Sequence, residues 1–342
     1  MNQTNSASVR ILRRAAGAAI IALPVLAGLC VSCNKTESAK PEPGKGIDDP
    51  TGRDLERLSK VDPKLIHYHE EGRIQTGIAQ PSAIATDALG TLLAARDNVV
   101  RLISPGNGVK EIAVAGTPSC LAIAQQVIYV GLTDRVETYT PEGRRIATWT
   151  LAKGTFLTGI AVSVDGKNVY LADSGHRVVL RTDLQGKVIN EIGKPDKERG
   201  IPGLNVPSPH LRVAAAADGT IWVNNTGLWR MENYSPDGTL EKFWGTSGPD
   251  IQQFVGCCNP TDFLLLPDGS FITAEKSVLR VKHYLPDGRF DSVVAAPDSF
   301  GKNINGLQMS LNPDGRVTVL ELGTGAVHVF ALSQVSGLGG GT

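Results

Sequence analysis

Short apolar runs separated by tight turns form a pattern that repeats six times after residue 80. Each copy has an apolar run, a turn such as Asp-Gly, a second apolar run that ends in a polar residue, and a third apolar run. The clearest copies are 161–187, 213–225, 264–289 and 310–321. One such unit cannot bury its own apolar surface, so neighbouring units must stack. Four short strands per unit predict the blades of a β-propeller and not a helical solenoid.

The ring closes through the N-terminal part of this region. Residues 65–77 are similar to 281–293, the outer half of a blade, yet they precede the first complete blade, while the last blade ends after its third strand, 326–332. The N-terminal strand is therefore expected to supply the outer strand of the last blade and to hide the open sheet edges. The prediction is an all-β, six-bladed propeller over residues 63–333. The blades are expected to begin near Pro81, Pro118, Leu157, Pro209, Pro260 and Gly306.

One blade carries a family resemblance. The segment ADSGHRVV (172–179), followed by LQGKVINEIG (184–193), is similar to the NHL repeat, with His176 at the histidine position of that motif. The likeness extends over roughly 65–332. It implies a six-bladed propeller that serves as a binding platform, with some relatives acting as lyases or hydrolases. It also implies that His176 is a turn-packing residue. A fold alone does not fix a function.

The N-terminus has the pattern of an export signal over residues 1–32. Three arginines, Arg10, Arg13 and Arg14, precede the apolar stretch 15–29, as in signals that direct secretion. An uncleaved membrane anchor is the alternative, and the apolar stretch is shorter than the ~20 residues that a spanning helix needs.

Cys33 is the expected site of lipid attachment. It follows Val31 and Ser32, which resembles the cleavage box of bacterial lipoproteins and implies that the lipidated cysteine becomes the new N-terminus. Cys30 stands where that family usually has Leu, and it fits less well as the lipid site. The predicted protein is exported and lipid-anchored to a bacterial envelope membrane, facing the periplasm or the surface. Residues 33–62 are polar and form a tether, and 334–342 form a frayed, disordered tail.

The composition limits the kinds of partner that the protein is expected to bind. Lys and Arg total 34 and balance 34 Asp and Glu, while 41% of the residues are hydrophobic and Gly 38 with Pro 20 suits a turn-rich β protein. The absence of a basic excess argues against nucleic-acid binding. An envelope protein or a small molecule is the expected partner, and the chain is expected to be a monomer.

Two sets of residues are predicted to share one rim of the central channel. Seven residues before each turn glycine, three blades have small residues, whereas three consecutive blades have Arg212, Asp262 and Gln308, with His210 just ahead of Arg212. The ends of the second strands have Arg96, Asp173, Asn225, Glu275 and Glu321, with Lys276 beside them. Buried polar groups near the axis need partners. They either pair with one another and seal the blade junctions, or they form a pocket for a small molecule or a partner loop.

Cys257 and Cys258 are the most unusual local feature. Adjacent Cα atoms are ~3.8 Å apart, below the usual disulfide span of about 4.4–6.8 Å, so a bond between them distorts the peptide. An oxidising envelope nevertheless favours a structural vicinal disulfide. Two free thiols, or a redox or metal-binding pair, are the alternatives.

Metal catalysis has little support in the sequence. An NHL-containing lyase family uses several histidines around a zinc ion, and His210 is placed like one of them. The equivalent positions in the other blades hold no histidine, so a three-histidine zinc site cannot be assembled. Calcium held by Asp262, Glu275 and Glu321 lacks a loop motif, and no nucleophile elbow or phosphate loop occurs. We therefore predict no cofactor and assign no catalytic residue. The expected function is a binding platform at the channel rim, and the alternative is a metal-dependent lyase or hydrolase that uses the same rim.

Overall fold

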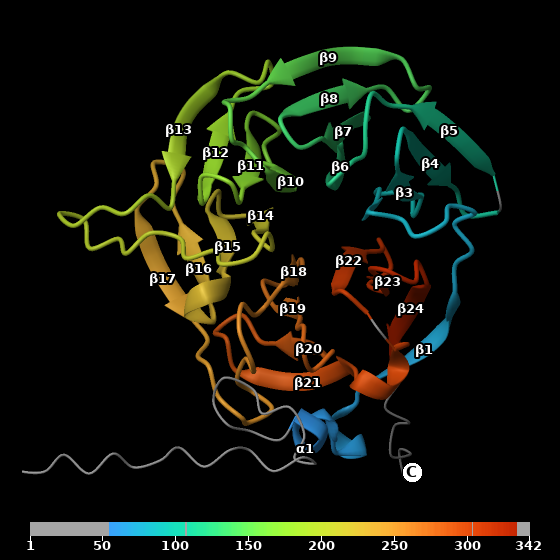
Figure 1. Cartoon of the computed structure of the whole chain (residues 1–342), viewed down its shortest axis with the longest axis vertical. Helices are drawn as coiled ribbons and strands as arrows, with labels where there is room; N and C mark the ends of the chain where they lie inside the picture. The colour runs from blue at the N-terminus through green and yellow to red at the C-terminus, as the bar shows by residue number, and fades with distance from the viewer. Residues whose placement is uncertain (1–54, 107, 303, 334–342) are drawn as a thin grey trace, which may run out of the picture. The chain divides into compact units, whose positions relative to one another are not determined.

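A computed structural model describes residues 55–106, 108–302 and 304–333, and it confirms the six-bladed propeller. Six four-stranded antiparallel sheets surround a central channel (Figure 1). The first three blades consist of β2 (Ala83–Thr86), β3 (Leu92–Arg96), β4 (Val99–Ile103), β5 (Val109–Ala113); β6 (Cys120–Ala124), β7 (Val127–Gly131), β8 (Arg135–Tyr139), β9 (Arg145–Thr150); β10 (Leu157–Val162), β11 (Val169–Asp173), β12 (Val178–Thr182) and β13 (Val188–Ile192).

The remaining blades have the same strand order from the channel outward. The outer strand of the last blade, however, comes from the N-terminal part of the chain. They consist of β14 (Val213–Ala215), β15 (Ile221–Asn225), β16 (Arg230–Tyr234), β17 (Leu240–Trp244); β18 (Asp262–Leu265), β19 (Phe271–Ala274), β20 (Val281–Tyr284), β21 (Phe290–Ala295); β22 (Leu307–Leu311), β23 (Val317–Glu321), β24 (Val327–Leu332) and β1 (Tyr68–Arg73).

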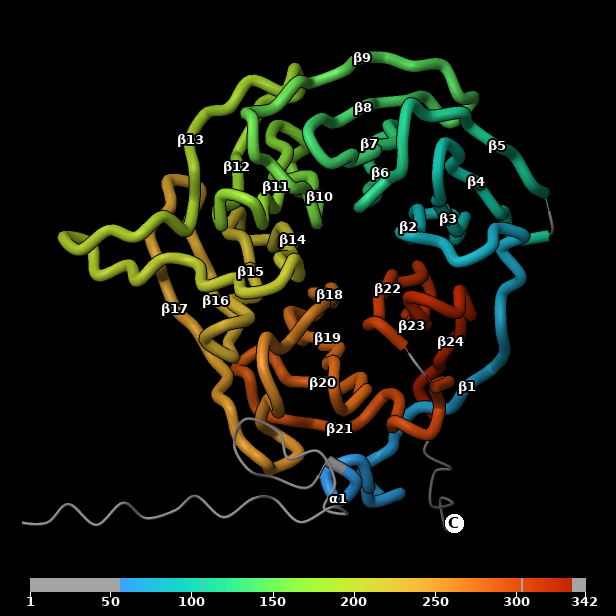
Figure 2. Tube along the Cα trace, viewed as in Figure 1, coloured from blue at the N-terminus to red at the C-terminus, as the bar shows by residue number. Residues whose placement is uncertain are grey.

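The N-terminal strand closes the ring, as the sequence predicts. Strand β1 pairs with β24, from Tyr68 opposite Leu332 to Arg73 opposite His328, with a bulge between Glu70 and Gly72. In Figure 2 the blue N-terminal strand lies beside the red C-terminal one. Closure leaves the last blade with four strands like the others and removes an exposed edge.

The loose alternation of apolar residues has a physical cause. In β11, β15, β19 and β23, the second strands of four blades, every residue is buried, because another blade covers each face. The outer strand β13 is exposed at three of its five positions. Strands covered on both faces have near-continuous apolar runs, and only the outer strands contribute an exposed face.

Turn glycines let the outer strand of one blade pack on the next. Trp244 in β17 lies against Gly288, whose φ is +84°, in the turn between β20 and β21. A Cβ atom at Gly288 would lie 2.5 Å from Cγ of the Trp244 ring. The glycine is therefore required both by its backbone conformation and by the close approach of the indole.

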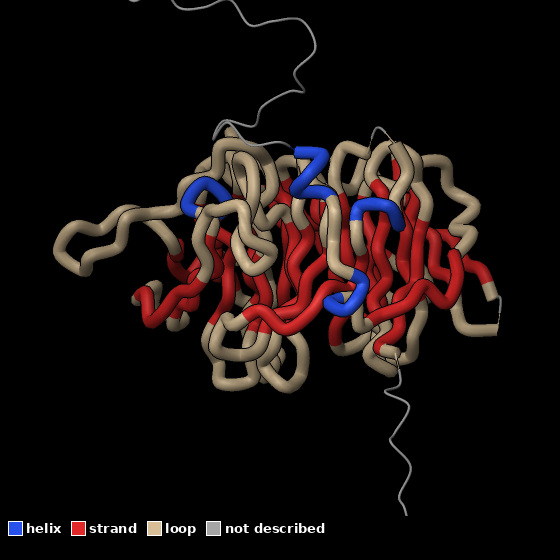
Figure 3. The backbone as a smooth tube through the Cα atoms, turned by 90° about the horizontal axis from the view of Figure 1, so that it is seen from below, coloured by secondary structure: helices blue, strands red, loops and turns tan. Residues whose placement is uncertain are grey.

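The short helices lie in the segments that precede or connect the strands. They are α1 (Leu55–Ser59), η1 (Pro63–Leu65), η2 (Thr226–Leu228) and η3 (Pro297–Ser299). Leu58 of α1 is 5% exposed and packs against Val255 and Val278, so this part of the predicted tether is docked on the fifth blade. No described helix is long and apolar enough to cross a membrane. The predicted signal, Cys33 and the tail 334–342 fall outside the described residues. In side view the strands form a layer with loops on both faces (Figure 3).

Candidate functional site

Both predicted sets of polar residues lie at the same edge of the blades. Antiparallel pairing places Asp262 opposite Ala274, directly before Glu275, and Leu307 opposite Glu321. The start of a first strand therefore lies beside the end of the second strand. This geometry defines one face of the ring, which we call the channel mouth, at the level of Arg212, Asp262 and Gln308.

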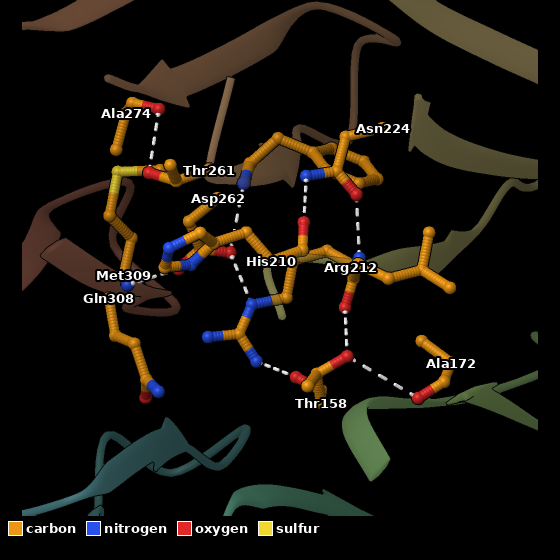
Figure 4. Close-up of polar contacts among 12 residues, drawn as sticks. Thr158, Ala172, His210, Arg212, Asn224, Thr261, Asp262, Ala274, Gln308 and Met309 are labelled. Atoms are coloured by element: carbon orange, nitrogen blue, oxygen red, sulfur yellow. Dashed lines mark hydrogen bonds and ion pairs between the residues drawn. The ribbon is translucent and has the colours of Figure 1, made fainter. Parts of the chain in front are cut away.

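Arg212 joins three blades at the mouth (Figure 4). Its Nε lies 3.2 Å from Oδ1 of Asp262 in the fifth blade, and its Nη1 donates to the carbonyl oxygen of Thr158 in the third. The side chain is 16% exposed and that of Asp262 is 7% exposed. The remaining terminal nitrogen, Nη2, has no hydrogen bond to a described residue and points toward the side of the mouth occupied by Gln308 in the figure.

Asp262 is held by backbone donors as well as by Arg212. Its Oδ2 accepts from the Met309 amide at 2.8 Å, and its Oδ1 accepts from the Phe263 amide at 2.9 Å. Burial raises the pKa of Asp262 despite the Arg212 guanidinium and these hydrogen bonds. The carboxylate ties the fifth blade to the sixth.

Gln308 joins the last blade to the first. Its Oε1 accepts from the Ile84 amide at 3.3 Å, and its Nε2 donates to the Ser82 carbonyl at 3.0 Å. The three axial polar residues thus make contacts across blade junctions, in agreement with the sealing interpretation. The contacts leave Nη2 of Arg212 unused, so the pocket interpretation also remains open.

Asn224 positions Arg212 and was not found from the sequence. Its Oδ1 accepts from the Arg212 amide at 2.6 Å, and its Nδ2 donates to the carbonyls of His210 and Pro260. The predicted neighbour, Asn225, lies on the opposite face of the strand, where its Oδ1 accepts from the Asn205 amide. Alternation along β15 separates the two side chains.

A cavity of about 280 Å³ occupies the channel at this level. Its mouth carries Arg212, Asp262, Gln308 and the thiol of Cys120. Burial raises the pKa of Cys120 to about 11, so the thiol is protonated at neutral pH. Below the mouth the wall is mostly apolar and includes Ile84, Leu121, Ile160, Val213, Phe263, Leu264 and Met309. The cavity thus has charged and amide side chains at one end and residues with apolar side chains along its length.

His210 and Lys276 lie beside this cavity on the rim. Burial and the positive charges of Lys276 and Arg212 lower the pKa of His210 to about 4, so its imidazole is neutral at pH 7. Nζ of Lys276 donates to Oγ of Ser208 at 3.1 Å, across the junction of the fourth and fifth blades. Lys276 forms no ion pair with a carboxylate among the described residues.

The other candidates at the ends of the second strands point away from the cavity. Asp173, Asn225, Glu275 and Glu321 are at most 3% exposed. Each accepts the backbone amide of a residue that leads into its own blade: Phe156, Asn205, Val255 and Gly301, respectively. Arg96 donates to the Gln80 carbonyl in a comparable way. These side chains fix the connections between blades and do not line the cavity.

One feature of this network was not predicted. Glu137, in the third strand of the second blade, accepts from the Ala115 amide at 3.4 Å and so takes the same role there. Nδ1 of His176 donates to Oδ2 of Asp173 at 2.7 Å, a contact that fits the turn-packing role implied by the NHL resemblance.

Glu275 belongs to a buried charged triad. Its Oε2 lies 2.8 Å from Nε of Arg280 and 3.1 Å from Nζ of Lys282, and all three side chains are at most 2% exposed. Burial lowers the pKa of Lys282 to about 8, although the Glu275 carboxylate opposes this effect. The triad has two cationic groups against one carboxylate, inside the blade and away from the mouth.

The adjacent cysteines are both free thiols in the structure. Cys257 is exposed, and Cys258 is buried with a positive φ of 62°. Burial raises the pKa of the Cys258 thiol, while the Ser208 hydroxyl and the Lys276 charge oppose the shift. The structure therefore differs from the expected bonded pair, and the vicinal disulfide stays a prediction.

The residues at the mouth do not fit the zinc or calcium sites considered above. Within 55–106, 108–302 and 304–333, no three or more His, Cys, Asp or Glu residues are placed to hold a metal ion. His210 has no second histidine beside it. Asp262 is paired with Arg212, and Glu275 and Glu321 are turned into separate blades.

Comparisons with known proteins support the fold. No family model and no curated protein matches the chain. A solved protein of unknown function from Bacteroides thetaiotaomicron VPI-5482 is similar at 19% identity and TM-score 0.58, over 76% of this chain and 71% of that one. Virginiamycin B lyase from Staphylococcus aureus is similar at 12% identity and TM-score 0.54, over 78% and 99%. The WD40 propeller domain of Doa1 has the same identity and TM-score, over 78% and 97%. At these identities the likeness defines the class, a β-propeller, and nothing finer.

Proposed function

We propose that the protein is a non-catalytic binding platform of the NHL-repeat type, and that a small ligand binds at the channel mouth. The single observation that carries this proposal is the Nη2 atom of Arg212. It faces a cavity of about 280 Å³ without a described hydrogen-bond partner, while Nη1 of the same guanidinium donates to the Thr158 carbonyl and Nε lies 3.2 Å from Oδ1 of Asp262. Binding sites combine an apolar wall with a few convergent polar groups, and this cavity has both.

A double variant tests the proposal without leaving a buried charge unpaired. In Arg212→Met/Asp262→Asn both charges are removed together, which avoids the large penalty of an isolated buried carboxylate. The matched control is Arg289→Met/Asp287→Asn, which removes an exposed ion pair of 2.6 Å on the outer edge of the fifth blade.

Ligand-observed NMR with a library of anionic, cationic and neutral small molecules provides the measurement. Compounds that bind the wild type and the control, but not the Arg212→Met/Asp262→Asn variant, support a site at the mouth. Equal binding to all three proteins would place the site elsewhere, and no binding across the library would contradict a small-molecule function.

The proposal includes attachment to a bacterial envelope membrane through Cys33. The support is the order of basic, apolar and small residues before that cysteine. A palmitate analogue should label the wild type in cells and not Cys33→Ala. Equal labelling of both proteins would reject lipidation at this position.

A further inference from the structure

The charges at the channel mouth do not balance. Arg212 and Asp262 neutralise one another at 3.2 Å. Lys276, two positions beyond the residue paired with Asp262, adds a positive charge that no described carboxylate meets. Glu275 is next to it in sequence but is turned into the blade, where Arg280 and Lys282 hold it. His210, whose pKa is lowered to about 4 by burial and by the charges of both cations, is neutral at pH 7. Arg212, Asp262, His210 and Lys276 together therefore have a surplus of one positive charge at pH 7.

The donors at the mouth also outnumber the acceptors that meet them. Nη2 of Arg212 has no described hydrogen-bond partner, and Lys276 uses one donor on the Ser208 hydroxyl. An ammonium group has three donors. A carboxylate is an acceptor-only group with two oxygens, and its bonds to charged donors are stronger than those between neutral groups.

The cavity below the mouth has a different character. Its wall includes Ile160, Val213, Phe263, Leu264 and Met309, from four different blades. Where these side chains reach the cavity, they favour contact with hydrocarbon over contact with a charged group. A ligand that uses both parts of the site has a charged end and an apolar body.

We infer that the channel mouth binds an organic monoanion, a carboxylate on an apolar body, with the carboxylate between Arg212 and Lys276 and the apolar body in the channel. The inference rests on the proposed binding function and names its ligand class. One surplus charge favours a monoanion over a phosphate monoester, which has nearly two negative charges at neutral pH.

Calorimetric titration of the purified protein with three ligands of equal length tests this inference. The probes are octanoate, octanamide and octylammonium, which share their chain and differ in the charge of the head. Octanoate should bind at least about tenfold tighter than octanamide, as expected for hydrogen bonds between charged groups. Octylammonium should bind weakest, because it meets the surplus positive charge.

Variants of two lysines test whether Lys276 causes the preference for octanoate. Lys276→Met should weaken octanoate about tenfold and leave octanamide unchanged, and Lys276→Glu should weaken octanoate further. Lys276 is half-buried on the rim, and Lys187 is an exposed lysine in the turn before β13, so Lys187→Met serves as the control and should change nothing. Circular dichroism of each variant checks folding.

The failures of the two proposals are distinguishable. Equal affinity for octanoate and octanamide, both lost in Arg212→Met/Asp262→Asn, would overturn the preference for an anion and leave the binding site in place. An equal effect of Lys276→Met and Lys187→Met would also overturn the inference, because the attraction would then be a general charge effect. If library compounds bind at the mouth but none of the three probes binds, the inferred apolar body of the ligand is wrong.

Discussion

Arg212 and Asp262 lie 3.2 Å apart across the junction of the fourth and fifth blades, and the pair is largely buried. Removing one partner of a buried pair leaves the other charge uncompensated. Arg212→Met should therefore lower the free energy of unfolding by roughly 3 kcal/mol, and adding Asp262→Asn should recover most of the loss. Chemical denaturation of the two single variants and the double variant measures this cycle.

The pH dependence of the single variant has a definite sign. Burial raises the pKa of Asp262 in the folded protein, and removing Arg212 raises it further, so the folded state binds a proton more readily than the unfolded state. Stability is then lost as pH rises from the unfolded pKa through the folded pKa. The loss in the free energy of unfolding caused by Arg212→Met should be smaller at pH 4 than at pH 7. A deficit that is independent of pH would contradict an ionised Asp262 as its cause.

Gly288→Ala should destabilise the protein more than Gly219→Ala. Both glycines have a positive φ, +84° and +86°, so both substitutions incur a backbone strain of about 1–2 kcal/mol. Only at Gly288 does the added Cβ atom meet Trp244, whereas nothing lies within 4 Å of the equivalent atom at Gly219. The displaced indole should add about 1–3 kcal/mol. Equal melting temperatures of the two variants would show that the Trp244 contact does not stabilise the blade junction.

Stability should rise with pH between about 8 and 10 because of Lys282. Its pKa is lowered from 10.5 to about 8 in the folded protein, so the unfolded state binds more protons in this range. Relative to Lys282→Met, the wild type should gain stability as pH rises, by at most about 1.4 kcal/mol per pH unit. A constant difference between the two proteins from pH 7 to pH 10 would mean that Lys282 titrates normally.

Ring closure by β1 should make Tyr68 important for stability. Tyr68 is 8% exposed in the core shared by the fifth and sixth blades, whereas its strand partner Leu332 is 61% exposed. Tyr68→Ala should cost about 3 kcal/mol. The control Leu332→Ala should stay within about 0.5 kcal/mol. Similar, small losses in both variants would show that the propeller does not depend on this strand.

The sequence predicts the propeller and its closure because both follow from strand periodicity. The turn glycines place Arg212, Asp262 and Gln308 at one level of neighbouring blades, and this level is the one that the cavity occupies. Position along a strand fixes the edge at which a residue lies, which is why the two predicted sets share a rim.

Position along a strand does not fix what a side chain binds. Glu275 and Glu321 end their strands at the rim, yet each turns toward a backbone amide of its own blade. Asn224 was missed in favour of Asn225 because the sequence does not show which face of β15 meets the incoming loop. Besides its contact with Glu275, Lys282 donates to the carbonyls of Ile251 and Gln253, in the loop 245–261, whose path depends on tertiary packing.

A crystal structure of the protein with the tightest-binding library compound shows whether the ligand occupies the channel mouth. We expect electron density for the compound in the channel, within hydrogen-bond distance of Arg212 Nη2. Density at the outer edge of a blade, with the channel mouth occupied by solvent alone, would contradict it.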